Sequence, residues 1–328
     1  MAWQVVIYFK PEVYLSLISP AMGNSGNLSL RHMFLAFLVV LIWGTNFIAV
    51  FVALKSYPPF LLSAVRFALS ALPWVFILPK PDAPLKFVLG YGVFNFALQF
   101  GLLFSGIHLG LSPGLASLLL QISVFFSMGL AFLFFKERSS LLKISGSLIS
   151  FVGIGIVATH IQGEATLTGL VLTLLAAFAW AAGNMFTKKV NAQSPLSLVV
   201  WGNLIALPFM AVVSVTIEGP ALIVHSIQST SWTVIAALFY IVYLSTHIGY
   251  GAWGFLLKSY SASAVVPFTL LIPVVGFLSS AAFLGEDLPW WKIVASLFIM
   301  GGLVFGLLGG ELRRVFRISN PGKENRYI

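Results

Sequence analysis

The stretch MFLAFLVVLIWGTNFIAVFVAL, residues 33–54, holds 22 residues without one charged side chain. A helix needs about 17 to 25 apolar residues to cross the roughly 30 Å hydrocarbon core of a bilayer. Nine comparable stretches follow: 59–79, 87–107, 112–135, 144–160, 167–187, 196–217, 232–257, 262–285 and 293–310. None shows the alternation of apolar and polar residues that barrel strands need. We therefore predict an all-α integral membrane protein with ten transmembrane helices.

The composition excludes an ordinary soluble fold, since 59% of the 328 residues are hydrophobic and only 8% are charged. Globular proteins carry about a quarter of charged residues. Ten spans put both termini on one side, and 15 of the 18 Lys and Arg residues then share that side. Lys55 and Lys292 fall on the other side, and Arg66 is the only charged residue inside a span. This asymmetry follows the positive-inside rule, so we expect both termini in the cytoplasm, the lipid bilayer as partner and no nucleic acid.

The chain matches itself in two registers. Glu137 aligns with Glu286 at an offset of 149 residues, and Trp43 aligns with Trp180 at an offset of 137. Each half holds five spans, an odd number, so the second half must enter the membrane from the opposite side. Inverted repeats place a substrate site near the midplane, and transport follows from rocking of one half against the other. The organisation therefore predicts a carrier made of two inverted five-helix repeats.

These boundaries divide the chain into four parts. We expect a cytoplasmic N-terminal extension, two repeats and a basic cytoplasmic tail, at residues 1–32, 33–160, 161–312 and 313–328. Gly302, Gly306 and Gly310 recur every four residues, a spacing that lets two helix backbones approach closely. The approach could occur within the fold or between protomers, so a monomer and a homodimer both stay open.

Polar side chains inside the spans are few, and they tend to face a bundle interior or a wet cavity. Tyr91, Asn95 and Gln99 step by four residues along one helix face, and a similar stripe runs from Tyr243 to Tyr250. Alternatively, these groups only hydrogen-bond neighbouring helices, at about 1 kcal/mol each or less. The candidate substrate-binding residues are Trp43, Asn46, Arg66, Tyr91, Asn95, Gln99, Gln121, Trp180, Asn184, Tyr243, His247, Tyr250 and Trp253.

Two of these candidates carry a specific hypothesis. Arg66 lies about seven residues into the second span, roughly 10 Å deep at 1.5 Å per residue. Its guanidinium could bind a substrate carboxylate, or it could lock a helix or snorkel to the interface. His247 is the only histidine well inside a span. It could carry a proton during transport, or it could be a hydrogen-bonded core residue.

The sequence lacks the groups that other mechanisms need. It has no cysteine, hence no thiol nucleophile or thiolate metal site, and no P-loop for nucleotide binding. No span contains a carboxylate that could serve as a general base or bind a cationic drug. We therefore expect no cofactor, no metal and no enzymatic activity.

Several stretches in this order resemble the EamA branch of the drug/metabolite transporter superfamily, most closely its O-acetylserine/cysteine exporter type. The matching residues are WGTNF at 43–47, PP at 58–59 with RF at 66–67, GLASLLLQ at 114–121 with Glu137, WAAGN at 180–184 with KK at 188–189, GYGAWG at 249–254, and LIPVVG at 271–276 with Glu286. Relatives often carry a lysine shortly after the first-span asparagine, where this chain has Phe51.

The resemblance implies a secondary transporter that exports small amino acids or related metabolites across the bacterial inner membrane by alternating access. The small-molecule substrate would be neutral, zwitterionic or weakly anionic. A channel-like facilitator or a lipid or metabolite scaffold is the alternative function, and an integral membrane transferase is a weaker one.

Overall fold

The computed structural model describes residues 28–136, 140–160, 165–187, 190, 194–260 and 262–318, without the side chains of 262–263 and 307–318. Across these ranges all regular elements are helical. Nine helical stretches in this part of the chain have the length and hydropathy to cross a membrane, and a tenth, Trp290–Gly306, is apolar but shorter. Residues 1–27 of the expected N-terminal extension and Glu137 lie outside the described residues.

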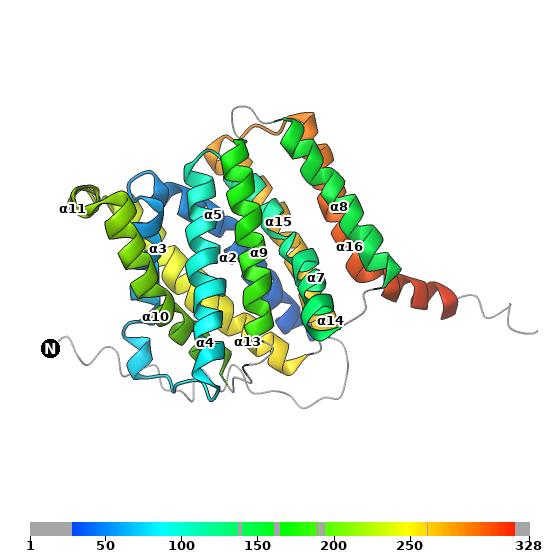
Figure 1. Cartoon of the computed structure of the whole chain (residues 1–328). Helices are drawn as coiled ribbons and strands as arrows, with labels where there is room; N and C mark the ends of the chain where they lie inside the picture. The colour runs from blue at the N-terminus through cyan, green and yellow to red at the C-terminus, as the bar shows by residue number, and fades with distance from the viewer. Residues whose placement is uncertain are drawn as a thin grey trace, which may run out of the picture.

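The helices of the first half are α2 (Leu30–Leu54), α3 (Pro59–Ala71), η1 (Trp74–Phe76), α4 (Leu85–Gly92), η2 (Val93–Leu98), α5 (Gln99–His108), α6 (Pro113–Leu120), α7 (Ser123–Phe135) and α8 (Leu141–Thr159). Those of the second half are α9 (Leu167–Thr187), α10 (Pro195–Val213), η3 (Ser214–Glu218), α11 (Pro220–Gln228), α12 (Trp232–Phe239), η4 (Tyr240–Gly249), α13 (Tyr250–Ser259), α14 (Ala262–Val265), η5 (Val266–Leu271), α15 (Ile272–Leu284) and α16 (Trp290–Ile318). Figure 1 shows them as one bundle, with α8 and α16 side by side at its edge.

Two elements differ from the sequence-based expectation. The sequence predicts the second span over 59–79, but the α-helix ends at Ala71 and a short 3₁₀ turn follows Pro73. Proline lacks the N–H that would continue the ladder and disfavours helical backbone in the residue before it, which explains the stop. The connection after the seventh span holds the extra helix α11, which begins at Pro220 directly after Gly219 at φ +83°.

The packing of α8 against α16 shows the inverted repeat at the level of single residues. A Cβ placed on Gly302 would lie 2.3 Å from the Gly146 carbonyl oxygen and 2.3 Å from Ser150 Oγ. A Cβ on Gly153 would lie 2.8 Å from the Ala295 carbonyl oxygen and 2.6 Å from the Ile299 side chain. Adding 149 to 153, 146 and 150 gives 302, 295 and 299, so the two contact sets are exchanged by the repeat.

Other helix contacts also occur in pairs that the repeat relates to each other, with the first span equivalent to the sixth, the third to the eighth and the fourth to the ninth. The first span packs on the ninth through α2 and α15, and the sixth packs on the fourth through α9 and α7. Likewise the third span contacts the sixth, and the eighth contacts the first. The two five-helix halves are therefore related by a pseudo-two-fold axis, as expected for oppositely oriented repeats.

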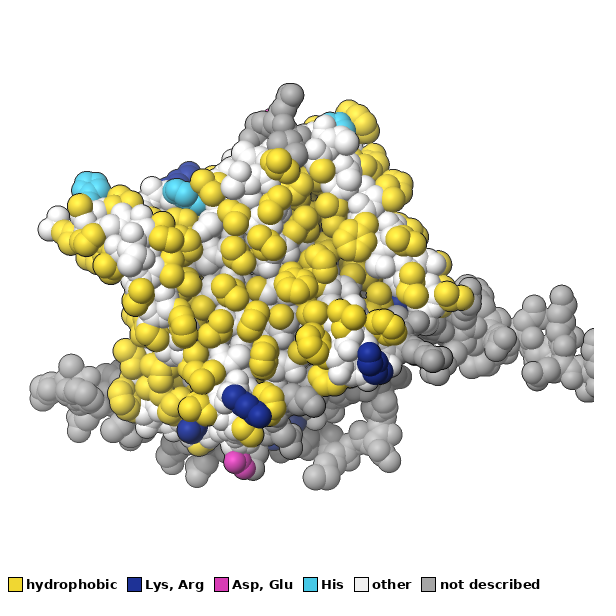
Figure 2. Space-filling view, viewed as in Figure 1, with side chains coloured by type: hydrophobic (Ala, Val, Ile, Leu, Met, Phe, Trp, Pro, Cys, Tyr) yellow, Lys and Arg dark blue, Asp and Glu magenta, His cyan; other side chains and the backbone are white. Residues whose placement is uncertain are grey.

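The outer surface is that of a membrane protein. Figure 2 shows hydrophobic side chains over most of the visible face, while most of the dark-blue Lys and Arg side chains lie along the lower edge. Large apolar side chains are exposed on the outer surface, for example those of Leu148, Phe178 and Leu297. Such exposure is favourable in a bilayer, because hydrocarbon, unlike water, solvates apolar groups. We call the end of the bundle that holds the loops 55–58, 109–112 and 285–289 the upper face, as in Figure 1.

Candidate transport cavity

A cavity of about 100 Å³ lies between the two halves. Helices α2, α3, α5, α6, α9 and α15 contribute to its wall, together with Ser245 of η4 and Tyr250, the first residue of α13. The lining residues are Trp43, Asn46, Phe47, Arg66, Gln99, Phe100, Leu103, Ser117, Leu120, Gln121, Trp180, Ser245, Tyr250 and Ile272. Seven sequence-predicted site residues are thus brought together here, namely Trp43, Asn46, Arg66, Gln99, Gln121, Trp180 and Tyr250.

Interruptions in the helices border this cavity in matched positions of the two halves. The π-helical segment η2 directly precedes Gln99, and the π-helical segment η4 directly precedes Tyr250. In the fourth span the helix breaks at Gln121, between α6 and α7, and in the ninth span η5 gives way to α15 at Ile272. Irregular backbone at membrane depth is tolerated where it borders a cavity, so these breaks mark the same site that the lining residues define.

Arg66 is the one charged residue of the described lining. Its side chain is 1% exposed, and Nη2 donates a hydrogen bond to Thr246 Oγ1 at 3.2 Å. The guanidinium also lies over the Phe100 ring, with Cζ 3.8 Å from the centroid, a cation–π contact. Nε and Nη1 are buried without a hydrogen-bond partner among the described residues.

This arrangement leaves Arg66 electrostatically incomplete. An arginine at the centre of a membrane helix costs about 3 kcal/mol on insertion scales, and one hydroxyl and an aromatic face satisfy only part of its donor set. Guanidinium groups offer a planar fork of donors that matches a carboxylate bidentately. Arg66, a residue of the cavity wall, therefore keeps two donors that no described residue satisfies.

The cavity amides add neutral polar groups to the same wall. Asn46 Oδ1 is buried without a hydrogen-bond partner in the described part of the chain. Gln121 donates through Nε2 to the Thr269 carbonyl at 2.9 Å, which leaves its side-chain oxygen as an acceptor. Gln99 is 4% exposed and lines the cavity next to Phe100. The cavity wall thus carries side-chain hydrogen-bond acceptors and donors in addition to the Arg66 guanidinium.

Aromatic rings close one side of the cavity. The Trp43 indole donates from Nε1 to the Ser245 carbonyl at 3.1 Å, and its ring lies 5.3 Å from that of Tyr250. A Cβ on Gly249 would lie only 2.5 Å from Trp43 Nε1, so only glycine lets the indole pack here. Trp43 is therefore held in place by the eighth span.

Tyr91 and Asn95 do not line the cavity with Gln99, although the sequence places the three at steps of four. The π-helical segment η2, Val93–Leu98, contains Asn95 and lies between Tyr91 and Gln99, and its wider turn changes the angle between successive residues. The Tyr91 ring instead packs on Phe96 at 5.4 Å, and Asn95 packs against Gly183.

Four further candidates lie outside the lining. His247 bridges two carbonyls, Nδ1 to Val242 at 2.8 Å and Nε2 to Ser70 at 3.0 Å, which fits the core-residue reading. Its ring stacks on that of Tyr243 at 5.5 Å, and the Trp74 ring packs against it at a tilt, 5.2 Å away. Asn184 contacts Ser127 Oγ at 3.5 Å, and Trp253 packs behind Trp43 at 5.5 Å.

Sequence reasoning did not single out the residues that contact the Arg66 guanidinium, namely Thr246, Phe100 and, with its ring centroid 5.9 Å from Cζ, Phe104. Phe100 is one of 30 phenylalanines and carries no polar signal. Thr246 lies inside η4, where helical periodicity does not apply. Only the position next to Gln99 could have drawn attention to Phe100.

The comparison with known families decides what kind of protein has this architecture. The profile of the EamA-like transporter family matches residues 30–159 and again residues 167–308. The chain belongs to the EamA-like transporter family.

Individual relatives of this EamA-like chain agree in length and fold. It is 40% identical over 299 residues to a protein of Salmonella typhimurium named a probable amino-acid metabolite efflux pump, covering 89% of this chain and 100% of that one. An Escherichia coli protein of the same name is 37% identical over 292 residues, covering 87% and 98%. A solved crystal structure at 18% identity covers 85% of this chain and 97% of that one with a TM-score of 0.55, which supports the fold. The predicted family and fold class are confirmed.

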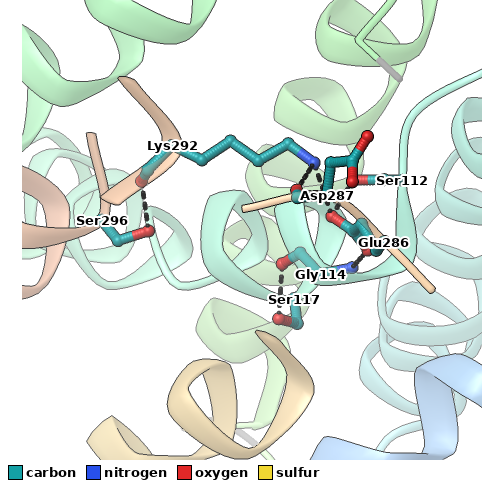
Figure 3. Close-up of polar contacts among 7 residues, drawn as sticks. All are labelled: Ser112, Gly114, Ser117, Glu286, Asp287, Lys292 and Ser296. Atoms are coloured by element: carbon teal, nitrogen blue, oxygen red, sulfur yellow. Dashed lines mark hydrogen bonds and ion pairs between the residues drawn. The ribbon is translucent and has the colours of Figure 1, made fainter. Parts of the chain in front are cut away.

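In this EamA-like transporter the buried Glu286–Lys292 ion pair of the second half is hydrogen-bonded to the first half at the upper face. The Glu286 carboxylate accepts hydrogen bonds from Ser112 Oγ at 2.5 Å, the Gly114 amide at 3.1 Å and Lys292 Nζ at 3.1 Å (Figure 3). Lys292 also donates to the Asp287 carbonyl at 2.8 Å. Because Ser112 and Gly114 begin α6 and Glu286 follows α15, the pair ties the first half to the second.

Proposed function

We propose that this EamA-like chain is a secondary transporter, rather than an enzyme, that exports small amino-acid metabolites across the bacterial inner membrane by alternating access. The names of the relatives from Salmonella and E. coli support the substrate class. The cavity between inverted halves supports the mechanism, because rocking of the halves would expose it to each side in turn.

The single observation that carries the proposal is the incomplete coordination of Arg66 on the cavity wall. Nε and Nη1 lack partners in the described structure, and each forms one edge of the guanidinium together with Nη2. A substrate α-carboxylate could bind with its two oxygens at the Nε–Nη2 edge or at the Nη1–Nη2 edge. Buried polar groups are normally hydrogen-bonded, so a bound carboxylate would remove the cost that one of these unpartnered donors bears. Arg66 is thus the proposed carboxylate anchor.

The size of the cavity suits a small metabolite. A water molecule needs about 10 to 15 Å³ of such volume, so a cavity of about 100 Å³ corresponds to roughly seven to ten water-sized groups. Serine, cysteine and O-acetylserine have about that many non-hydrogen atoms, whereas aromatic amino acids exceed it. The amino group would meet the Asn46 and Gln121 oxygens and the aromatic faces, because the described lining holds no carboxylate.

The charge distribution supports an orientation with the lower face in the cytoplasm. The lower-face ends of the spans carry Lys80, Lys86 and Lys258, whereas Lys55 lies at the upper face. Under the positive-inside rule both termini would be cytoplasmic and the upper face periplasmic.

Counterflow tests the carrier mechanism against the channel alternative. In proteoliposomes preloaded with unlabelled serine, cysteine or O-acetylserine, we expect outside tracer of the same compound to accumulate transiently above its equilibrium level. Tracer that only equilibrates would indicate a channel, and absence of tracer movement for all three compounds would contradict the proposed substrate class. Phenylalanine serves as the size control and should not exchange.

Substitution of Gln99 by alanine should weaken transport, because Gln99 contributes an amide to the cavity wall. Loss of one hydrogen bond of about 0.5–1.5 kcal/mol corresponds to roughly a 2- to 10-fold lower transport efficiency. Asn184→Ala is the matched control, since Asn184 lies outside the lining and should retain transport. The measurement is initial uptake rate at matched protein amounts. Equal loss in both variants would count against the assigned cavity.

A further inference from the structure

We propose that two carboxylates of the second half, Glu218 and Glu286, act as clamps that close the upper face of the cavity during the transport cycle. This inference rests on the alternating-access mechanism proposed above. Each clamp consists of one carboxylate and the helix N-terminus of the first half that it holds: Glu218 with α3, and Glu286 with α6.

The Glu286 clamp is buried and fully engaged. The carboxylate is 3% exposed and receives the Ser112 hydroxyl, the Gly114 amide and the Lys292 ammonium (Figure 3). A Cβ on Gly114 would lie 3.0 Å from both carboxylate oxygens, so the backbone of α6 approaches the acid closely. The positive end of the α6 dipole adds to the attraction.

The Glu218 clamp repeats this design on another helix. Its Oε1 accepts from the Phe60 amide at 2.7 Å, and its Oε2 accepts from the Leu61 amide at 2.9 Å and from Ser214 Oγ at 2.7 Å. Phe60 and Leu61 are in the first turn of α3, whose N-cap, Pro58, supplies no side-chain hydrogen bond. The acid from the second half therefore takes the capping role.

Both clamped helices lead directly into the cavity. Arg66 lies on α3, seven residues from Pro59, and Ser117 lies on α6, one turn from Gly114. Ser117 Oγ donates to the Gly114 carbonyl at 2.7 Å, which links the clamp to the lining (Figure 3). Displacement of α3 or α6 at the upper face would thus move the wall that binds substrate.

Contacts between the halves at the lower face are of another kind. There, in the described part of the chain, His32 Nδ1 meets the Tyr260 hydroxyl at 2.6 Å, and Ser197 Oγ donates to the Pro79 carbonyl. Hydrogen bonds in which one partner is ionised are roughly twice as strong as neutral ones. At the upper face the halves also meet through two neutral hydrogen bonds, Tyr57 with Thr230 and Thr166 with the Leu109 carbonyl. Rocking that opens this face must break or stretch both clamps as well, so the clamps add to the stability of the closed state.

Cysteine accessibility tests this inference directly, because the chain has no cysteine of its own. Ser245→Cys places one thiol in the cavity lining. In right-side-out membrane vesicles, a membrane-impermeant methanethiosulfonate should label this thiol slowly in the parent. We expect Glu218→Gln to raise the labelling rate about threefold or more, and Glu218→Gln with Glu286→Gln and Lys292→Met to raise it at least about tenfold.

Asp287→Asn is the matched control, since it removes a charge from the same loop while its exposed side chain makes no clamp contact in the described structure. Ser112→Ala and Ser214→Ala remove one hydrogen bond from each clamp and keep the charges, so they should raise labelling by a smaller factor even if the Gln variants fold poorly. Labelling rates equal to the parent in these variants, or an equal rise with Asp287→Asn, would overturn the clamp assignment. Labelling needs no transported substrate, so failure of the counterflow experiment would leave this result interpretable.

Discussion

Arg66→Gln should nearly abolish transport of carboxylate-bearing substrates while the protein remains folded. The variant removes the only cation of the described lining and the two donors that lack partners there. Hydrogen bonds to charged groups contribute about 1.5–3 kcal/mol each, so loss of one should lower transport efficiency by roughly 10- to 160-fold, and loss of two by more. The transport efficiency of Arg66→Lys should lie between those of the parent and Arg66→Gln, because an ammonium keeps the charge but lacks the planar pair of donors of a guanidinium. Initial rates in proteoliposomes give the ratio.

The control for this loss is Arg31→Gln, which removes an exposed arginine near the start of α2, far from the cavity lining. It should transport at the parental rate. Gel filtration and thermal unfolding should show all three variants folded, because glutamine lowers the desolvation cost that Arg66 bears. Full transport by folded Arg66→Gln would assign Arg66 a structural role only.

Gly302→Val should destabilise the fold through the α8–α16 contact. A Cβ at this position would lie 2.3 Å from the Gly146 carbonyl oxygen, a backbone atom that cannot rotate away. Overpacking of this kind costs typically about 1–3 kcal/mol, and more where backbones must separate. We expect a lower melting temperature in detergent and loss of expression, because the two helices make most of their contacts with each other.

Gly301→Val is a control one residue away on the same helix. A Cβ on Gly301 would meet nothing within 4 Å among the described residues, and the residue lies at the lipid-exposed surface. The melting temperature of this variant should stay within a few degrees of the parent. Similar destabilisation by both substitutions would show that helix propensity, and not the close approach, controls stability here.

Much of the architecture follows from the sequence because membrane helices obey strong constraints. The long apolar stretches, in which Arg66 is the only charged residue, indicate the spans. The matches of Glu137 with Glu286 and of Trp43 with Trp180 indicate the repeat. The close approach expected for Gly302 and Gly306 occurs within the fold, against Gly146, while Gly310 lies where side-chain surroundings are not described. The hydropathy of the chain and the offsets between matching residues are enough to predict the spans and the repeat.

The site was only partly predictable because it forms where helices are irregular. Gln99 and Tyr250 line the cavity, but Tyr91 and His247, placed on the same predicted stripes, do not, since η2 and η4 break the period. No local pattern in the sequence predicts a π-helical segment. The partners of Glu286 were likewise hidden, because Ser112 lies 174 residues away and only the fold brings the two together.

The central claim is that Arg66 binds the substrate carboxylate, and a two-by-two comparison tests it most directly. The dissociation constants of serine and of serinamide, which lacks the carboxylate, are measured by titration calorimetry on the purified parent and on purified Arg66→Gln. We expect the parent to prefer serine by about 10-fold or more, the equivalent of one charged hydrogen bond, and the variant to lose this preference. An unchanged preference in Arg66→Gln would contradict the account.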